Sequence, residues 1–144
     1  MTNPEKRRFS YAERIGERRM RFDARFEHES QLASRVESAG LSTLHHRVLR
    51  IIIYVCDGHS DCYIGDRAIG ERAGISSRRA SAIVEELAEA KVLFAVKDDS
   101  VPARRRVVLT NHPETDATMR ELFLRGNVRK ANPWLLPWVP PASG

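Results

Sequence analysis

The sequence contains no apolar run that approaches the roughly 20 residues an α-helix needs to cross a lipid bilayer. Its first residues, MTNPEKRRFSYAERIGERR, also lack the apolar stretch of a secretory signal peptide. We therefore expect a cytoplasmic protein that has no membrane partner. Charged residues make up 30% of the chain and apolar residues 42%, which is typical of a soluble globular domain rather than of a disordered chain.

The sequence also lacks the motifs of common enzymes. It has no Gly-rich phosphate loop, no nucleophile elbow and no histidine pair at metal-binding spacing on a helix. The stretch CDGHSDC places Cys56, His59 and Cys62 near one another, but a structural zinc site needs four ligands. A disulfide between the two cysteines is improbable in the cytosol. We therefore predict no enzyme, no metal and no cofactor.

Positive charge is concentrated in two parts of the chain, whose net charge is +5. Residues 1–25 hold eight Lys or Arg against four Asp or Glu, and residues 97–106 hold four against two. This excess suits a polyanionic partner, although many basic proteins bind none. The N-terminal arm and the segment ARRRVV are therefore the candidate contacts with nucleic acid.

Residues 1–40 are predicted to form a basic helical arm. Between Tyr11 and Ala39 there is no proline and one glycine, which predicts a long helix that could break near Glu29 and Ser30. One stripe of this helix is apolar and consists of Ile15, Phe22, Phe26 and Ala33. Beside it lies a stripe of Arg14, Arg18, Arg21 and Arg25. The arginines are either a solvated face beside a packing face or a row of phosphate contacts.

Residues 41–112 are predicted to form the central domain. LSTLHHRVLRIIIYVCDG begins with hydroxyl residues that can cap a helix, continues with apolar residues and ends at a glycine, which indicates a buried helix. The β-branched run Ile51–Val55 also suits a strand, but the preceding LHHRVLR carries helical spacing. Further along, VLFAVKD and RRRVVLT, joined by DSVPA, predict a β-hairpin.

Between these elements, GDRAIGERAGISSRRASAIVEELAEAKVL predicts two helices joined by a tight turn. Asp66 is expected to cap the first helix, and Gly74 to end it in the left-handed conformation. Ile75 would fill the angle between the helices, and Ser76 would cap the second helix. The expected inward residues are Ile69 and Ala73 of the first helix and Ala80, Ile83, Val84 and Leu87 of the second.

This order of a helix, a helix-turn-helix and a hairpin resembles the winged helix-turn-helix superfamily over residues 44–110, in the versions of bacterial regulators and of phage or plasmid replication proteins. Tyr63 in a short strand and the AGIS turn carry the resemblance. It implies a mainly α fold with a small β-hairpin wing. The supporting helix would be Asp66–Ala73, the recognition helix Ser77–Ala90 and the wing Val92–Thr110. Glu85, Glu86 and Lys91 depart from the pattern of the family, which has further basic residues and a glycine there.

The resemblance implies sequence-specific binding of double-stranded DNA. Short side chains at the start of the recognition helix would let it approach the bases, while Arg78 or Arg79 would reach a guanine edge or a phosphate. The candidate recognition residues are Ser76, Ser77, Arg78, Arg79, Ser81 and Ala82. The candidate wing contacts are Arg104, Arg105 and Arg106, of which the first and last share one strand face.

Residues 113–144 are predicted to be a short helix followed by a tail, NPWLLPWVPP. Four prolines within nine residues exclude a regular helix or a central strand from the tail. Its candidate partner-binding residues are Trp134, Leu135, Leu136 and Trp138. These side chains are expected to dock on the chain's own core, on a second subunit or on another protein.

Three functions fit these observations. The first is transcriptional regulation by a homodimer that pairs through the arm or the tail. The second is replication or maintenance of a plasmid or phage, which would use the same DNA-binding domain. The third is a protein-interaction module in which a winged helix is only the scaffold and the Trp-rich tail is the working surface.

Overall fold

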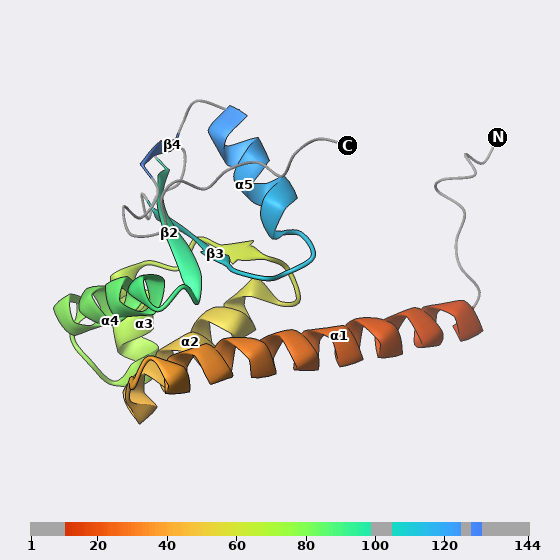
Figure 1. The fold of residues 1–144 in the computed structure, drawn as a ribbon, viewed down its shortest axis with the longest axis horizontal. Helices are drawn as coiled ribbons and strands as arrows, with labels where there is room; N and C mark the ends of the chain where they lie inside the picture. The colour runs from red at the N-terminus through yellow and green to blue at the C-terminus, as the bar shows by residue number, and fades with distance from the viewer. Residues whose placement is uncertain (1–10, 99–104, 125–127, 131–144) are drawn as a thin grey trace.

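The computed structural model describes residues 11–98, 105–124 and 128–130, which contain five helices and four strands (Figure 1). In chain order they are α1 (Tyr11–Ser38), α2 (Thr43–Cys56), β1 (Asp61–Cys62), α3 (Asp66–Ala73), α4 (Ser77–Glu89), β2 (Leu93–Asp98), β3 (Arg105–Leu109), α5 (Thr115–Leu124) and β4 (Val128–Lys130). The strands form one antiparallel sheet in the order β1-β3-β2-β4. The predicted mainly helical fold with a small β-hairpin is therefore confirmed, while strand β4 was not predicted.

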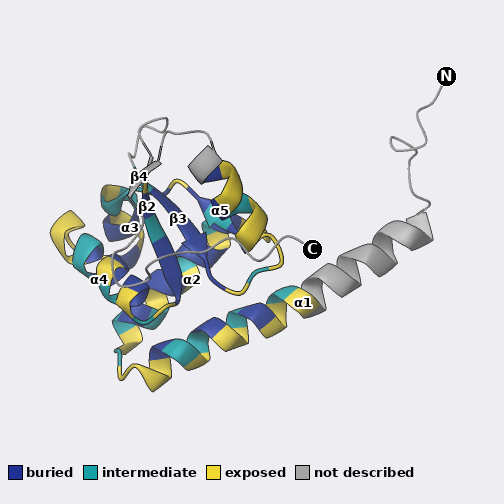
Figure 2. Cartoon of the chain, turned by 45° about the horizontal axis from the view of Figure 1, so that its top comes forward, coloured by how far each residue is buried: buried dark blue, intermediate teal, exposed yellow. Residues whose placement is uncertain are grey.

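The sheet separates two apolar clusters because alternate residues of a strand face opposite sides. Leu93 and Val107 face the main core, which they form with α2, α3 and α4. Phe94 and Val108 face the other side, where they pack against Met119 of α5. The buried side of each helix in Figure 2 accordingly faces the sheet or a neighbouring helix. The larger cluster contains the helix pair on which the predicted function depends.

Helix α2 is the central helix, so the alternative of a strand over Ile51–Val55 is wrong. Its start is a capping box between Ser42 and His45, and its end is Asp57 in the left-handed conformation. The side chains buried along α2 are His45, Val48, Leu49, Ile52, Ile53 and Cys56. They recur every three or four residues, as one helical face requires. The helical spacing thus prevails over the strand preference of the isoleucines.

Helix α1 is continuous, so the break considered near Glu29 and Ser30 does not occur. The face that packs on the domain also differs from the predicted one. His28, Leu32 and Val36 are buried at intervals of four residues, whereas Phe26 is 66% exposed. Phe26 of the predicted apolar stripe is therefore not on the packing face, which includes a histidine that is polar in the sequence; the side chains of Ile15 and Phe22 lie outside the described residues.

Two polar side chains attach α1 to the base of the hairpin. His28 Nε2 lies 2.7 Å from the carbonyl oxygen of Thr110, directly after β3. Arg35 Nη1 donates to the carbonyl of Lys91, two residues before β2, at 2.7 Å, and to the Thr110 hydroxyl at 3.1 Å. Lys91 has a φ of 63°, which is the left-handed conformation that favours glycine. Arg35 thus stabilises this residue from α1.

Candidate nucleic-acid interface

Helices α3 and α4 meet at a turn whose geometry depends on two glycines. Gly74 ends α3 in the left-handed conformation, with φ 75° and ψ 34°, as predicted. Gly70, inside α3, is buried, and a Cβ atom there would lie 2.5 Å from the carbonyl oxygen of Ile75. Only a residue without a Cβ permits this close approach of the turn to α3. The residue before α3 that caps it is Gly65, so the prediction that Asp66 is the cap is wrong.

The start of α4 follows the prediction closely. The Ser76 hydroxyl accepts a hydrogen bond from the backbone N–H of Arg79 at 3.1 Å, which is an N-cap. Ile75 is half-buried between the helices. The four predicted inward residues of α4, which are Ala80, Ile83, Val84 and Leu87, have no exposed surface. One side of α4 is therefore fixed in the core, and the other remains available.

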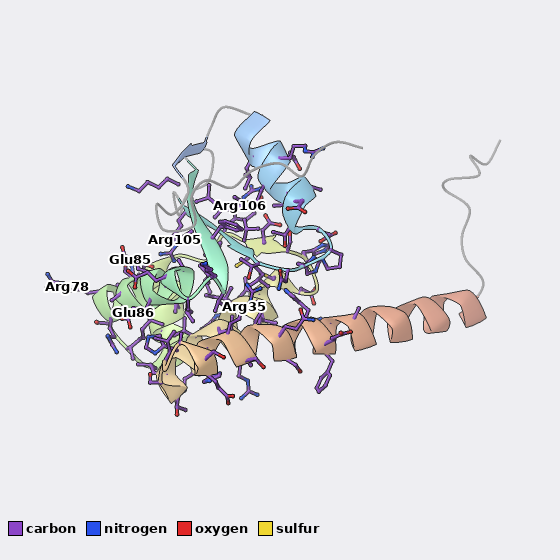
Figure 3. The ribbon with its side chains drawn as sticks, viewed as in Figure 1. Arg35, Arg78, Glu85, Glu86, Arg105 and Arg106 are labelled. Atoms are coloured by element: carbon purple, nitrogen blue, oxygen red, sulfur yellow. The ribbon has the colours of Figure 1, made fainter. Side chains whose placement is uncertain are left out.

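The exposed side of α4 includes residues at its N-cap and in its first two turns. Ser76, Ser77, Arg78 and Arg79 are exposed, and Ser81 and Ala82 are half-buried. Figure 3 shows Arg78 at the outer end of α4, pointing away from the other elements. No ion pair joins Arg78 to another residue in the part of the chain that the structure describes. Its guanidinium group is thus presented to a ligand beside the positive end of the helix dipole.

Glu86 is turned toward α2 rather than toward this surface. Its Oε2 atom lies 2.9 Å from Nε2 of His45, whose side chain is 5% exposed. The Nδ1 atom of His45 accepts from the backbone N–H of Ser42, so Nε2 carries the proton that is donated to Glu86. Arg79 Nη1 lies 3.7 Å from the other carboxylate oxygen of Glu86. Glu86 therefore joins α4 to α2 and neutralises part of the charge of Arg79.

Arg105, a predicted wing contact, is used inside the fold. Its Nη1 lies 2.5 Å from Oδ1 of Asp66, and its Nη2 donates to the carbonyl of Ile64 at 3.2 Å. The side chain is 16% exposed. The phosphate contact at Arg105 stays a prediction, and in the structure the guanidinium group binds the first residue of α3 and so connects β3 to the helix pair.

Arg106 is also used inside the fold. Its guanidinium carbon lies 4.2 Å from the centre of the Tyr63 ring, and it donates to the Tyr63 hydroxyl. Its Nη1 lies 3.3 Å from Oδ2 of Asp61, and the side chain is 7% exposed. Burial raises the pKa of the Asp61 carboxyl, and the adjacent Arg106 opposes this rise. The DNA contact at Arg106 likewise stays a prediction, for a guanidinium group that Tyr63 and Asp61 hold within the fold.

The structure describes only some of the other residues that were predicted to make contacts. Arg25 Nε lies 3.2 Å from Oε1 of Glu29, and its Nη1 lies 3.9 Å from Oδ1 of Asp57. The side chain of Arg25 is 37% exposed. Arg14, Arg18 and Arg21 belong to α1, but their side chains lie outside the described residues. Arg104 lies outside them too, as do Trp134, Leu135, Leu136 and Trp138 of the tail.

The sulfur atoms near the end of α2 are held together inside the fold. Cys56 and Cys62 are both buried and reduced, and they are hydrogen-bonded to each other. This bond, together with burial, raises the pKa of the Cys56 thiol. Within residues 11–98, 105–124 and 128–130, no group of three or more His, Cys, Asp or Glu side chains could hold a metal ion. No helix in the same ranges combines the length and the apolar character of a membrane span.

A search against protein-family models found no match, and neither did searches of curated proteins and of solved structures.

Proposed function

We propose that this protein is a winged helix-turn-helix protein that binds double-stranded DNA in a sequence-specific manner, with transcriptional regulation as its use. In this proposal α4 is the recognition helix, α3 is the supporting helix and the β2–β3 hairpin is the wing. The single observation that carries the proposal is that the first two turns of α4 expose one face, which includes Arg78, while the opposite face is buried.

The tight turn between α3 and α4 supports this proposal. A recognition helix enters the major groove only when it projects beyond the helix that precedes it. The contact between Gly70 and the carbonyl of Ile75 fixes this junction without a flexible loop. Ser77, Ser81 and Ala82 are short enough for the backbone to approach base edges, and Arg78 has the reach and the planar donors to bind a guanine.

The ion pairs of α4 indicate how far along the helix DNA contact extends. Glu86 is directed toward His45, and Glu85 is exposed on the third turn. A carboxylate near the phosphates would be repelled, so contact is expected over the first two turns. The helix N-terminus, which is the positive end of the helix dipole, favours a phosphate there.

The experiment that tests this proposal is the selection of bound sequences from a random duplex library. The selected duplex and a scrambled duplex are then titrated by fluorescence anisotropy at two salt concentrations. We expect an enriched motif and a log-log salt slope of about 0.9 for each phosphate neutralised. Unselective but salt-sensitive binding would contradict sequence-specific recognition. The absence of binding to any duplex would contradict a DNA-binding function.

A further inference from the structure

A groove of about 410 Å³ lies between α1 and α2, on a different part of the molecule from the exposed face of α4. Phe26 of α1 and Tyr54 of α2 border it, and they are 66% and 72% exposed. Leu49 and Ile53 contribute apolar surface to the groove. Large aromatic side chains exposed on two neighbouring helices indicate a surface that binds another apolar surface.

The sequence pattern extends the apolar stripe of this groove along α1. Phe26 and Ala33, which line the groove, belong to the same helical stripe as Phe22 and Ile15 of the sequence. Figure 1 shows that the N-terminal half of α1 extends past the other elements of the domain. A helix that packs on nothing is only marginally stable in water. A partner that covers the stripe would therefore stabilise the projecting half of α1.

The charges of α1 indicate what this partner is. Residues 11–22 contain four arginines and two glutamates, whereas residues 23–38 contain two arginines and four carboxylates. The two halves of the helix thus carry net charges of +2 and −2. Two copies of α1 side by side in opposite directions would place each basic half against an acidic half. Copies in the same direction would place like charges together.

We propose that α1 pairs with α1 of a second copy of this chain in an antiparallel arrangement, with Phe26 near the two-fold axis and the groove receiving the partner's apolar stripe. Such an interface is isologous, because the same surface serves both copies. The residues that line the groove are distinct from Ser76–Ala82 of α4. The dimer therefore leaves α4 exposed, and its formation does not depend on the proposed DNA binding.

The first test is sedimentation of the full-length protein without DNA at micromolar concentrations. We expect a dimer whose dissociation constant rises by about tenfold or more in Phe26→Glu, because an aromatic side chain at the centre of an interface contributes much of the affinity. Gln31→Glu is the matched control, since it adds the same charge to an exposed position of α1 that lies off the stripe. Circular dichroism checks that both variants fold.

The second test is the orientation of the two helices. In an antiparallel pair centred near residue 24, which sets each basic half against an acidic half, Phe26 of each copy lies close to the two-fold axis, so a Phe26→Cys variant should cross-link to its partner under mild oxidation. Ile15→Cys should not, because the two introduced thiols would lie roughly 27 Å apart along the helices, at about 1.5 Å for each residue. The unsubstituted chain, whose two cysteines are buried, is the control.

Three results would overturn the proposal. A monomeric full-length chain would show that the groove does not receive a second copy and would direct attention to the Trp-rich tail as its occupant. A dimer that Phe26→Glu leaves intact would place the interface elsewhere. Equal cross-linking of Ile15→Cys and Phe26→Cys would show a parallel pair. None of these results bears on DNA binding by α4, which is measured separately.

Discussion

The carboxylate of Glu86 binds the buried imidazole of His45 at 2.9 Å, and this contact joins the predicted recognition helix to the central helix of the core. The two residues are 41 positions apart in the chain. Because Glu86 is directed inward, its carboxylate serves the packing of α4 on α2.

We therefore expect Glu86→Ala to lower the free energy of unfolding by about 1 to 2 kcal/mol, since the buried His45 donor would lose its acceptor. Glu85→Ala, at the neighbouring exposed position, should change it by less than about 0.5 kcal/mol. Urea unfolding of the two variants measures the difference. Equal effects of both substitutions would contradict the role of the Glu86 contact.

Gly70 should be intolerant of any side chain. A Cβ atom at this position would lie 2.5 Å from the carbonyl oxygen of Ile75, and backbone cannot move aside as a flexible side chain does. Although alanine is the better helix former, Gly70→Ala should destabilise the fold by about 1 to 3 kcal/mol through overpacking. Thermal unfolding measures this effect, with Arg67→Ala on the exposed side of α3 as the control. A stabilised Gly70→Ala variant would show that α3 and the turn are not in close contact.

Arg105 should affect folding more than DNA binding. Its guanidinium group lies 2.5 Å from the Asp66 carboxylate and is mostly buried. We expect Arg105→Ala to cost about 1 to 3 kcal/mol of stability through the loss of a hydrogen bond to a charged group. A double-mutant cycle with Asp66→Ala should show coupling between the two residues. Additive effects would contradict the interaction between Arg105 and Asp66. A loss of DNA affinity without a loss of stability would support Arg105 as a wing contact.

The attachment of α1 should weaken in acid. Burial lowers the pKa of His28 below the usual 6.5, with the nearby His112 and Arg35 lowering it and the Thr110 carbonyl and Glu29 raising it. Above pH 6.5 the imidazole is neutral in both the folded and the unfolded chain, so its contribution to stability is complete. Below pH 6.5 the unfolded chain takes up the proton first, so stability falls until the folded pKa is passed.

Unfolding of the wild type and of His28→Gln from pH 7.5 to 5 measures this contribution. The difference in unfolding free energy between the two proteins should become smaller as the pH falls, because only the wild type has His28 to protonate. Other titrating groups, including Asp61, are common to both proteins and cancel in the comparison. A difference that is constant across this pH range would contradict the predicted shift.

Much of the helix pair could be predicted from the sequence because its determinants are local. Gly74, Ser76 and the apolar spacing of α4 act within a few residues, and the bounds of α3 were predicted to the residue. Helix caps and helical periodicity are properties of a short stretch of chain. The same reasoning failed at Asp66, where the residue before it serves as the cap and the carboxylate binds Arg105 instead.

The contacts that the sequence could not reveal are between residues far apart in the chain. Arg105 and Asp66 are 39 positions apart, so neither the basic strand nor the acidic helix start shows that they pair. In the sequence, a run of arginines beside a predicted DNA-binding motif predicts phosphate contacts, because the sequence does not show which residues of the fold the arginines bind. On α1, the buried His28 has a backbone carbonyl as its partner, and no pattern of side chains indicates such a partner.

The most direct test of the central claim is the affinity of Arg78→Ala for the selected duplex, with Arg120→Ala, an exposed arginine of α5, as the control. If Arg78 reads a guanine, Arg78→Ala should lose about 1 to 3 kcal/mol of binding and should relax the preference at one base pair, while Arg120→Ala should bind as the wild type does. Equal affinities of all three proteins would contradict recognition of DNA by the exposed face of α4.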